Sequence, residues 1–200
     1  MAYFFNKVSN PTSIHEAVKA PSSAESQKWY KDQATALASG ASPGKLMNDP
    51  TNVVTKIDVY SIGKLFMFYY DPKMKDVLPF YDTFPLVFPI GFRPNGFLGL
   101  NLHYLPPVLR AKLMNSLYET INNDRNDETT ALQISYQILN SAAQYNAFRP
   151  CVKQYLWDYV AGGRFLRVEV QNWDNAVMLP LERFQKASKD LVWKTSQARL

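Results

Sequence analysis

Alternating apolar residues over positions 86–104 predict a β-hairpin. One set of alternate positions is apolar in each half of this stretch, namely Leu86, Phe88, Ile90 and Phe92, then Leu98, Leu100, Leu102 and Tyr104. A three-residue loop, Pro94 to Gly96, pairs Phe92 with Leu98 and joins the two sets into one apolar face. Gly96 would then take the left-handed position of a bulge. A two-residue Asn-Gly turn would pair Phe92 with Gly99 and separate the two faces, so the sequence favours the longer loop.

The rest of the predicted sheet follows from the neighbouring positions. The other face of the hairpin, which we expect to meet solvent or a partner, carries Val87, Pro89, Gly91, Gly99, Asn101 and His103. Pro89 has no N–H group for a sheet hydrogen bond, which indicates an edge strand. Upstream, residues 63–73 (GKLFMFYYDPK) are apolar at consecutive positions, which is typical of a strand covered on both faces. These patterns predict a small, strongly curved or barrel-like antiparallel sheet over residues 60–105.

After Pro106 the apolar spacing becomes that of helices. Residues 106–123 carry Leu109, Leu113, Leu117 and Ile121, and residues 127–145 carry Leu132, Ser135, Tyr136, Leu139 and Ala143. A third helix is predicted over residues 150–163, with Val152, Tyr155, Leu156, Tyr159 and Val160 inward. Alternation in residues 164–170 (RFLRVEV) indicates one more strand. Residues 174–200 predict two short helices, because Pro180 interrupts any longer one.

The first 56 residues read as an N-terminal helical arm and linker. Ser22 and Glu25 form a capping box before a helix whose apolar face is thin, so we expect the arm to lie across a neighbour, in this chain or in another subunit. Residues 57–200 are expected to form one α+β domain. Its sheet spans residues 60–105, and helices with one strand occupy residues 106–200.

Composition fits a globular chain with a basic end. The 200 residues are 46% hydrophobic and 20% charged, and the net charge is +5. Residues 149–200 hold nine Lys or Arg against five acids, a net of +4, which favours a polyanionic partner such as DNA but serves solubility equally well. The longest apolar run, LFMFYY, is far shorter than the roughly 18 residues that cross a bilayer. We therefore expect no membrane partner, and an intracellular product.

Little in the sequence predicts catalysis. Two histidines and the single cysteine, Cys151, give no cluster with the spacing of a zinc site, and a buried thiol is the simpler interpretation of Cys151. Asp158, Glu169 and Gln171 loosely resemble the carboxylates that hold Mg²⁺ in restriction-type nucleases, although Asp158 falls in a predicted helix. We therefore predict no enzyme activity, no cofactor, no metal and no small-molecule substrate.

Binding to phosphate fits the basic residues better. Arg164 and Arg167 flank an aromatic residue, and Arg183, Lys186 and Lys189 recur on one side of a predicted helix. The candidate DNA-binding residues are Arg149, Lys153, Arg164, Arg167, Arg183, Lys186, Lys189 and Lys194. A solvated helix face explains the pattern equally well, because Glu182 and Asp190 can form ion pairs with the Lys and Arg side chains.

Several motifs, in order over about residues 60–195, resemble a family of virion proteins from large contractile-tailed bacteriophages. They are YDPKMKDVLPFYDTFPLVFPIGF, GFLGLNLHYLPPVLRAKLMNSLY, RPCVKQYL and LPLERFQKASK. Within that group the chain is most similar to the DNA end protector, or head-completion, proteins. The resemblance implies a protein of the virion, and of the host cytoplasm during assembly, that binds the ends of packaged double-stranded DNA, shields them from exonuclease and allows the tail to join.

A second function stays open at this point. The chain could be a purely structural component of the neck, tail or baseplate, which joins other virion proteins through its N-terminal arm and an edge of its sheet.

Overall fold

The computed structural model describes residues 52–106, 109–111, 113–114, 116–117, 127–178 and 181–197. Its main sheet has six strands, paired antiparallel throughout, in the order β1-β7-β2-β4-β5-β6. Their bounds are β1 Val53–Val54, β7 Phe165–Val168, β2 Leu65–Met67, β4 Leu86–Arg93, β5 Gly96–Asn101 and β6 Val152–Leu156. A separate two-stranded ribbon pairs β3 (Tyr81–Asp82) with β8 (Phe184–Gln185).

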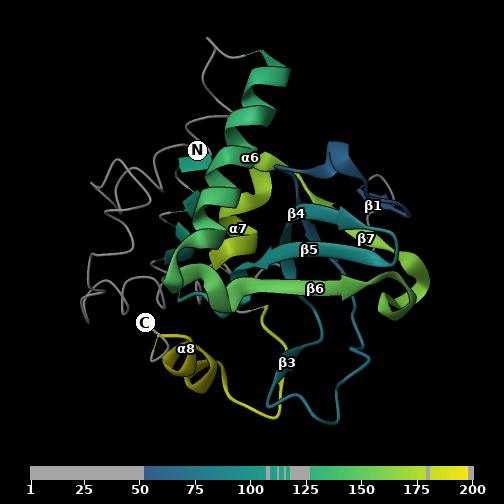
Figure 1. The fold of residues 1–200 in the computed structure, drawn as a ribbon, viewed down its shortest axis with the longest axis vertical. Coiled ribbons are helices and arrows are strands. Elements are labelled where there is room, and N and C mark those ends of the chain that lie inside the picture. The colour runs from purple at the N-terminus through teal and green to yellow at the C-terminus, as the bar shows by residue number, and fades with distance from the viewer. Residues whose placement is uncertain are drawn as a thin grey trace.

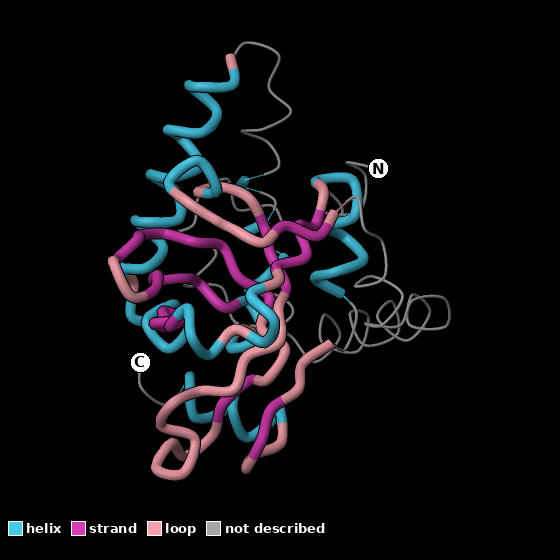
Figure 2. Tube along the Cα trace, turned by 90° about the vertical axis from the view of Figure 1, so that its right-hand side faces the viewer, coloured by secondary structure: helices cyan, strands magenta, loops and turns pink. Residues whose placement is uncertain are grey.

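Helices gather on one side of this sheet (Figure 1). The α-helices are α6 (Glu128–Gln144), α7 (Trp173–Met178) and α8 (Lys189–Gln197). Short 3₁₀ turns join the elements: η1 Val59–Ser61, η2 Leu102–Tyr104, η3 Asn146–Cys151, η4 Trp157–Tyr159, η5 Ala161–Gly163 and η6 Val170–Asn172. The ribbon of β3 and β8, with the loops around it, forms a lobe below the sheet (Figure 2). None of the helices among the described residues has the length and apolar character needed to cross a membrane.

Both faces of the sheet are buried. One face packs against the helices through Leu65, Met67, Phe88, Leu139 and Trp173. The opposite face carries a cluster dominated by aromatic rings: Phe66, Phe68, Phe97, Tyr155 and Phe165. The two-sided burial predicted for the run in residues 63–73 is confirmed for Leu65 to Phe68 and for Tyr70, while Tyr69 is half-buried. The second hairpin face, for which the sequence predicts contact with solvent or a partner, is instead covered by the chain itself, because Val87, Asn101 and His103 are fully buried.

The sheet is curved, as predicted, but it is not closed into a barrel, since β1 and β6 remain its two edges. Three inter-strand spacings, roughly 14 Å in a flat sheet, separate β7 from β5. The ring centroids of Phe165 and Phe97 nevertheless lie 6.1 Å apart. Curvature therefore brings strands that are not neighbours to one aromatic core on the concave side.

The hairpin differs from the prediction in register. Arg93 pairs with Gly96 and Phe92 with Phe97, so the loop has two residues, Pro94 and Asn95. A register shift between Pro89 and Gly91 adds one residue to β4. This bulge turns Phe92 to the aromatic face while Phe88 and Ile90 stay on the helical face.

Two residues predicted from that hairpin therefore have other roles. Pro89 does not mark an edge strand, because β4 lies between β2 and β5; it lies at the bulge, beyond the last pair with β2, Phe66 with Val87. Gly96 is not at positive φ. A glycine is needed at position 96 because the backbone of β6 lies close to it: a Cβ there would lie 1.9 Å from the carbonyl oxygen of Tyr155.

The third predicted helix is wrong, because residues 152–156 form the edge strand β6. Pro150 removes a helical hydrogen bond at its start, and the segment VKQYL pairs residue by residue with β5, from Val152 with Leu100 to Leu156 with Gly96. Its spacing fitted a helix as well as a strand, and pairing with β5 decided the outcome. The strand predicted in residues 164–170 is confirmed as β7.

The other helical predictions agree better with the structure. Helix α6 is confirmed, and the Asp127 side chain caps it by accepting from the Thr130 N–H at 2.7 Å. Its predicted inward residue Tyr136 is instead 40% exposed. Residues 109–111, 113–114 and 116–117 are helical, with Leu113 and Leu117 buried, and α7 and α8 are the two short helices of the tail.

The arm predicted for residues 1–56 lies mostly outside the described residues. Within it, Val53 and Val54, assigned to the linker by the sequence, pair with Leu166 and Phe165 as an edge strand. The division of the chain at residue 56 stays a prediction.

Replacing Gly96 with alanine tests the packing of β6 against the hairpin. The added Cβ would collide with the backbone of Tyr155, so β6 must shift and the free energy of unfolding should fall by about 2 kcal/mol. Gly91→Ala is the matched control, since a Cβ there has open space around it. Urea denaturation of both variants measures the difference, and equal stabilities would contradict the close approach.

Candidate nucleic-acid interface

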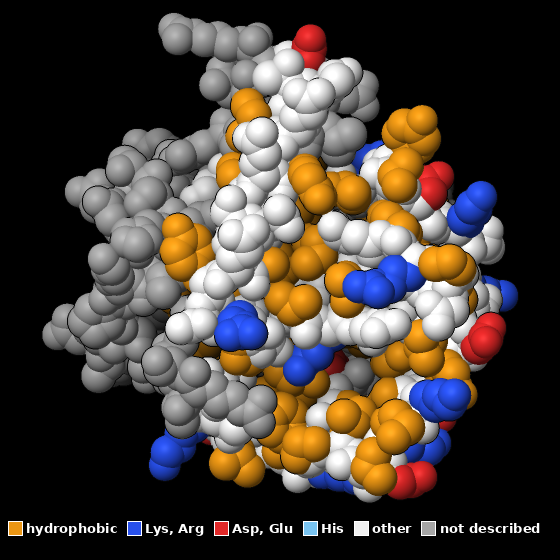
Figure 3. All heavy atoms as spheres, viewed as in Figure 1, with side chains coloured by type: hydrophobic (Ala, Val, Ile, Leu, Met, Phe, Trp, Pro, Cys, Tyr) orange, Lys and Arg blue, Asp and Glu red, His pale blue; other side chains and the backbone are white. Residues whose placement is uncertain are grey.

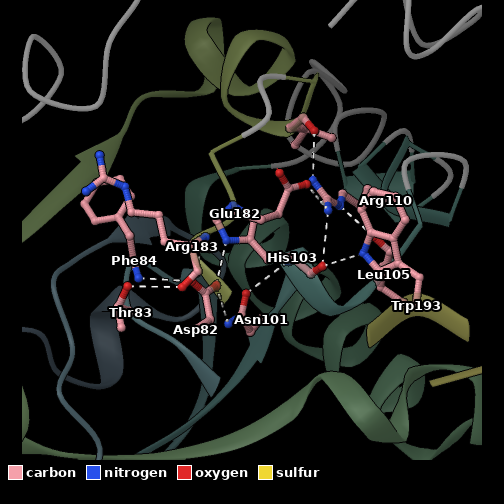
Figure 4. A network of polar contacts seen from close by, with 11 residues as sticks. Asp82, Thr83, Phe84, Asn101, His103, Leu105, Arg110, Glu182, Arg183 and Trp193 are labelled. Carbon is pink, nitrogen blue, oxygen red and sulfur yellow. Dashed lines mark hydrogen bonds and ion pairs between the residues drawn. The ribbon is translucent and has the colours of Figure 1, made fainter. Parts of the chain in front are cut away.

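A buried polar network ties the β3–β8 ribbon to the main sheet (Figure 4). The Asp82 carboxylate accepts from the Phe84 N–H at 3.0 Å, from the Asn101 amide at 3.1 Å and from the Arg183 N–H at 3.3 Å. It also lies 2.7 Å from Nδ1 of His103, whose side chain is fully buried. One carboxylate therefore holds together β3, the end of β5 and the start of β8.

Arg110 forms the second half of this network. Its guanidinium donates to the carbonyl oxygens of Leu105 at 2.7 Å and His103 at 3.2 Å, and it forms an ion pair with Glu182. The indole N–H of Trp193 donates to the same His103 oxygen at 2.8 Å, which anchors α8. Burial alone would raise the pKa of Glu182, but the charge of Arg110, the nearby His103 and the hydrogen bonds to the carboxylate together outweigh it and lower the pKa to about 2.

A cleft of about 390 Å³ opens between the β6 edge and the segment of residues 70–82. Aromatic residues form much of its wall: Tyr70, Phe80, Tyr81, Tyr104 and Tyr155. Lys73 and Lys153 supply its two positive charges, and the Lys153 ammonium lies 4.0 Å from the centre of the Tyr104 ring. Asp82 and Asn101 line it as well, so the cleft adjoins the buried network.

Six of the eight predicted basic residues lie on or beside η3, β6, β8 and α8. We call them the α8 basic group: Arg149, Lys153, Arg183, Lys186, Lys189 and Lys194. Turn η3 contacts both β6 and α8, and the rings of Tyr104 and Phe184 lie 5.0 Å apart, which links β8 to the cleft. These four elements contain one acid, Asp190. In the face drawn in Figure 3, Lys and Arg side chains lie over the sheet and along the lower edge, with apolar side chains between them.

The predicted helical face of Arg183, Lys186 and Lys189 is wrong. Arg183 and Lys186 flank the strand β8, and only Lys189 lies in a helix. Lys186 has a φ of 67°, and its ammonium donates to the carbonyl oxygens of Lys75, Asp76 and Leu78 at 2.6–3.2 Å. Lys186 therefore braces the loop that walls the cleft, and it is not simply solvated.

Arg164 precedes β7 and Arg167 lies in it, near the opposite edge of the sheet from β6. With Lys56 and Lys64 they form what we call the β7 basic group. Arg167 pairs with Glu169, and its Nε donates to that carboxylate at 2.6 Å. Part of the charge at β7 is therefore balanced by Glu169.

The residues of the nuclease pattern are not assembled as a metal site. Asp158 is in the turn η4, and Glu169 is engaged by Arg167. As far as residues 52–197 are described, no three His, Cys, Asp or Glu side chains converge on a position for a metal ion. Cys151 is buried as predicted, and burial raises the pKa of its thiol.

Sequence reasoning missed the network and the cleft. Arg110 is a charged residue directly after Leu109, the first residue of the predicted apolar stripe. Nothing else in the local sequence indicates that its side chain is buried. Its partner Glu182 is 72 residues away, and Asp82 lies 101 residues from Arg183. Such distant pairs leave no spacing that a single sequence could reveal.

Comparison with known proteins gave one match. A family model described as the phage T4 terminal DNA protecting protein matches residues 13–198. Searches among curated proteins and among solved structures found no match.

The Arg110–Glu182 pair should make stability fall in acid. Because the folded pKa of Glu182, about 2, lies below its ordinary 4.5, the pair stabilises the fold above about pH 4.5, and this stabilisation is lost as the pH falls toward 2. The loss is on the order of 3 kcal/mol. Glu182→Gln should remove this part of the pH dependence and cost about 3 kcal/mol at pH 7, because it leaves the guanidinium buried without a counter-charge.

Denaturant unfolding of both proteins between pH 7 and pH 2.5 measures this dependence. Asp190→Asn, which changes an exposed carboxylate, is the control and should keep the wild-type pH profile. An unchanged profile for Glu182→Gln would contradict the assignment.

Proposed function

The chain belongs to the family of the phage T4 terminal DNA protecting protein, and on that premise we propose that it binds the ends of packaged double-stranded DNA and shields them from exonuclease. The observation that carries the proposal is the family match over residues 13–198, which includes the whole sheet, the cleft and the α8 basic group. The protein acts as a binding component, without chemistry of its own.

The α8 basic group is the DNA-contacting surface in this proposal. Four of its six cations lie in η3, β6 and α8, which contain one acid, Asp190, whereas Arg167 of the β7 basic group is paired with Glu169. Phosphate contacts from Lys and Arg give affinity and position without reading bases. A protein that must cap every DNA end, whatever its sequence, needs this kind of contact.

We also propose the place where this binding occurs. The protein acts in the virion, after acting in the host cytoplasm during assembly, and its presence on the DNA end accompanies head completion and the joining of the tail. Contacts with other virion proteins through the N-terminal arm belong to this part of the proposal.

One observation favours a second function, in which protein contacts alone matter. Val59 and Tyr60 in η1 are 57% and 72% exposed, on an element away from the α8 basic group. Exposed aromatic and branched residues are typical of protein interfaces. A structural component of the neck, tail or baseplate could use this turn to join a neighbour.

The salt dependence of duplex binding tests the DNA-contacting surface. Affinity should fall as the salt concentration rises. In a plot of the logarithm of the binding constant against the logarithm of salt concentration, each phosphate contact contributes about −0.9 to the slope. The triple variant Arg149→Ala, Lys189→Ala, Lys194→Ala should reduce the magnitude of that slope by up to about 2.7, because all three side chains are exposed. Linear duplex mixed with this variant should also be degraded sooner by a processive exonuclease.

The matched control removes the same charge from the opposite side, as Lys56→Ala, Lys64→Ala, Arg164→Ala. We expect it to keep most of the wild-type slope and protection. Equal losses in the two triple variants would mean that overall charge, not the α8 basic group, holds DNA. Negligible binding by the wild type at low salt would reject the DNA-end function in favour of the structural one.

A further inference from the structure

The cleft beside β6 has the dimensions and lining of a site for one nucleotide. Its volume of about 390 Å³ falls within the range of pockets that hold small organic ligands, roughly 300–1,000 Å³. One wall is the β6 edge from Val152 to Leu156, and the other is formed by the segment from Tyr70 to Asp82. The loop in that second wall is held in place by the Lys186 ammonium, which contacts three of its carbonyl oxygens.

The lining matches the two chemical parts of a nucleotide. Phe80 and Tyr81 are half-buried aromatic rings in the wall, and a base can stack on such rings whatever its identity. Lys73 is exposed at the same cleft and offers a positive charge for a phosphate, and Lys153, over the Tyr104 ring, adds to the positive potential there. The carboxylate in the lining, Asp82, is buried and engaged by His103 and Asn101.

An unsatisfied hydroxyl gives an independent sign of a ligand. The Tyr155 hydroxyl is buried and makes no hydrogen bond of normal geometry among the described residues, although the Asn101 side chain lies close to it. Burial raises the pKa of Tyr155 well above its ordinary value, and the nearby Tyr104 and Asp82, which also line the cleft, raise it further, against a smaller opposing effect of the Asn101 side chain. The group therefore stays protonated as a hydrogen-bond donor, and a buried donor without an acceptor is unfavourable until something fills the site.

We infer that this cleft receives the terminal nucleotide of a DNA strand, and that it is the part of the protein that distinguishes an end from the interior of a duplex. This inference rests on the proposed DNA-end function. Phosphate contacts from the α8 basic group are available all along a duplex, so they cannot select its end. A nucleotide inside the duplex is stacked and paired on both sides, whereas one at the terminus leaves the stack at lower cost.

The cleft adjoins the α8 basic group, so both can act on one DNA end. Lys153 belongs to both, since it lies on β6 and lines the cleft. Tyr104, whose ring it covers, contacts Phe184 beside Arg183. A duplex held by its phosphates on the α8 side would therefore bring its last nucleotide to the opening between β6 and the segment of residues 70–82.

Two forms of one duplex test this inference: a linear form with open ends, and the same sequence closed by a hairpin loop at each end. The wild type should bind the open form about tenfold or more tightly. Tyr155→Phe, which removes only the hydroxyl, should lower this ratio about fivefold, the usual effect of one neutral hydrogen bond. Lys73→Ala should lower it as well. Affinity for the closed form should stay unchanged in both variants, because the α8 basic group is intact.

Matched controls separate a ligand contact from a general effect. Tyr136→Phe changes a partly exposed tyrosine on α6, and Lys64→Ala removes an exposed charge outside the cleft; both should keep the wild-type ratio. The melting temperature of Tyr155→Phe should equal or exceed that of the wild type, since its hydroxyl makes no hydrogen bond of normal geometry that could be lost. A marked fall in melting temperature would show instead that the hydroxyl supports the fold.

Photocrosslinking locates the nucleotide directly. A 5-iodo-2′-deoxyuridine at the terminal position of the open duplex should crosslink to a peptide containing Phe80, Tyr81 or Tyr104, and the same label six positions inward should not. A terminal crosslink confined to α8, or an unchanged open-to-closed ratio in Tyr155→Phe and Lys73→Ala, would overturn the inference while leaving DNA binding in place. Absence of binding to either duplex form would instead reject the proposed function itself.

Discussion

The buried guanidinium of Arg110 is the constraint around which the C-terminal half of the structure is organised. Its side chain is 1% exposed, and a charge removed from water in this way requires both a counter-ion and acceptors for its N–H groups. Glu182 supplies the counter-ion, and the carbonyl oxygens of Leu105 and His103 supply acceptors. These partners come from separate parts of the chain, so satisfying one side chain fixes the turn η2 after β5, the segment before β8 and the helical residues 109–111 relative to one another.

That constraint extends to the candidate interface through His103. Its carbonyl oxygen accepts from Arg110 and from Trp193, which sets the position of α8, while its ring contacts Asp82, which sets the position of β3 and β8. The cations of α8 and the wall of the cleft are thus held by groups that meet at one residue. The α8 cations and the cleft wall are therefore coupled, and a displacement of the polar network would move both of them together.

Local pattern predicted the elements whose own residues decide their structure. The all-apolar run from Leu65 to Phe68 requires cover on both sides, and the Asp127 cap starts α6 where the apolar helical period begins. Prediction failed where a distant partner decides. The spacing of residues 152–156 fits a helix, and their structure as a strand depends on hydrogen bonds with β5. The hairpin register depends on a bulge at Ile90 that the spacing of apolar residues does not predict. The basic candidates could be counted from the sequence, but the Lys186 contacts and the Arg167–Glu169 pair required the fold.

Charge and shape contribute differently to recognition of a DNA end. A net charge of +5 attracts any polyanion, and phosphate contacts hold the interior of a duplex as well as its terminus. Discrimination requires a feature that only a terminus can satisfy, and the site that we infer for one terminal nucleotide would meet that requirement, because a nucleotide inside a continuous duplex is stacked and paired on both sides. The acid in the lining of the cleft, Asp82, would repel a phosphate if it were unpaired. Asp82 accepts hydrogen bonds from the contacts that bind β3 and β8 to the sheet, so the same network that stabilises the fold also reduces the repulsion between this carboxylate and an anionic ligand.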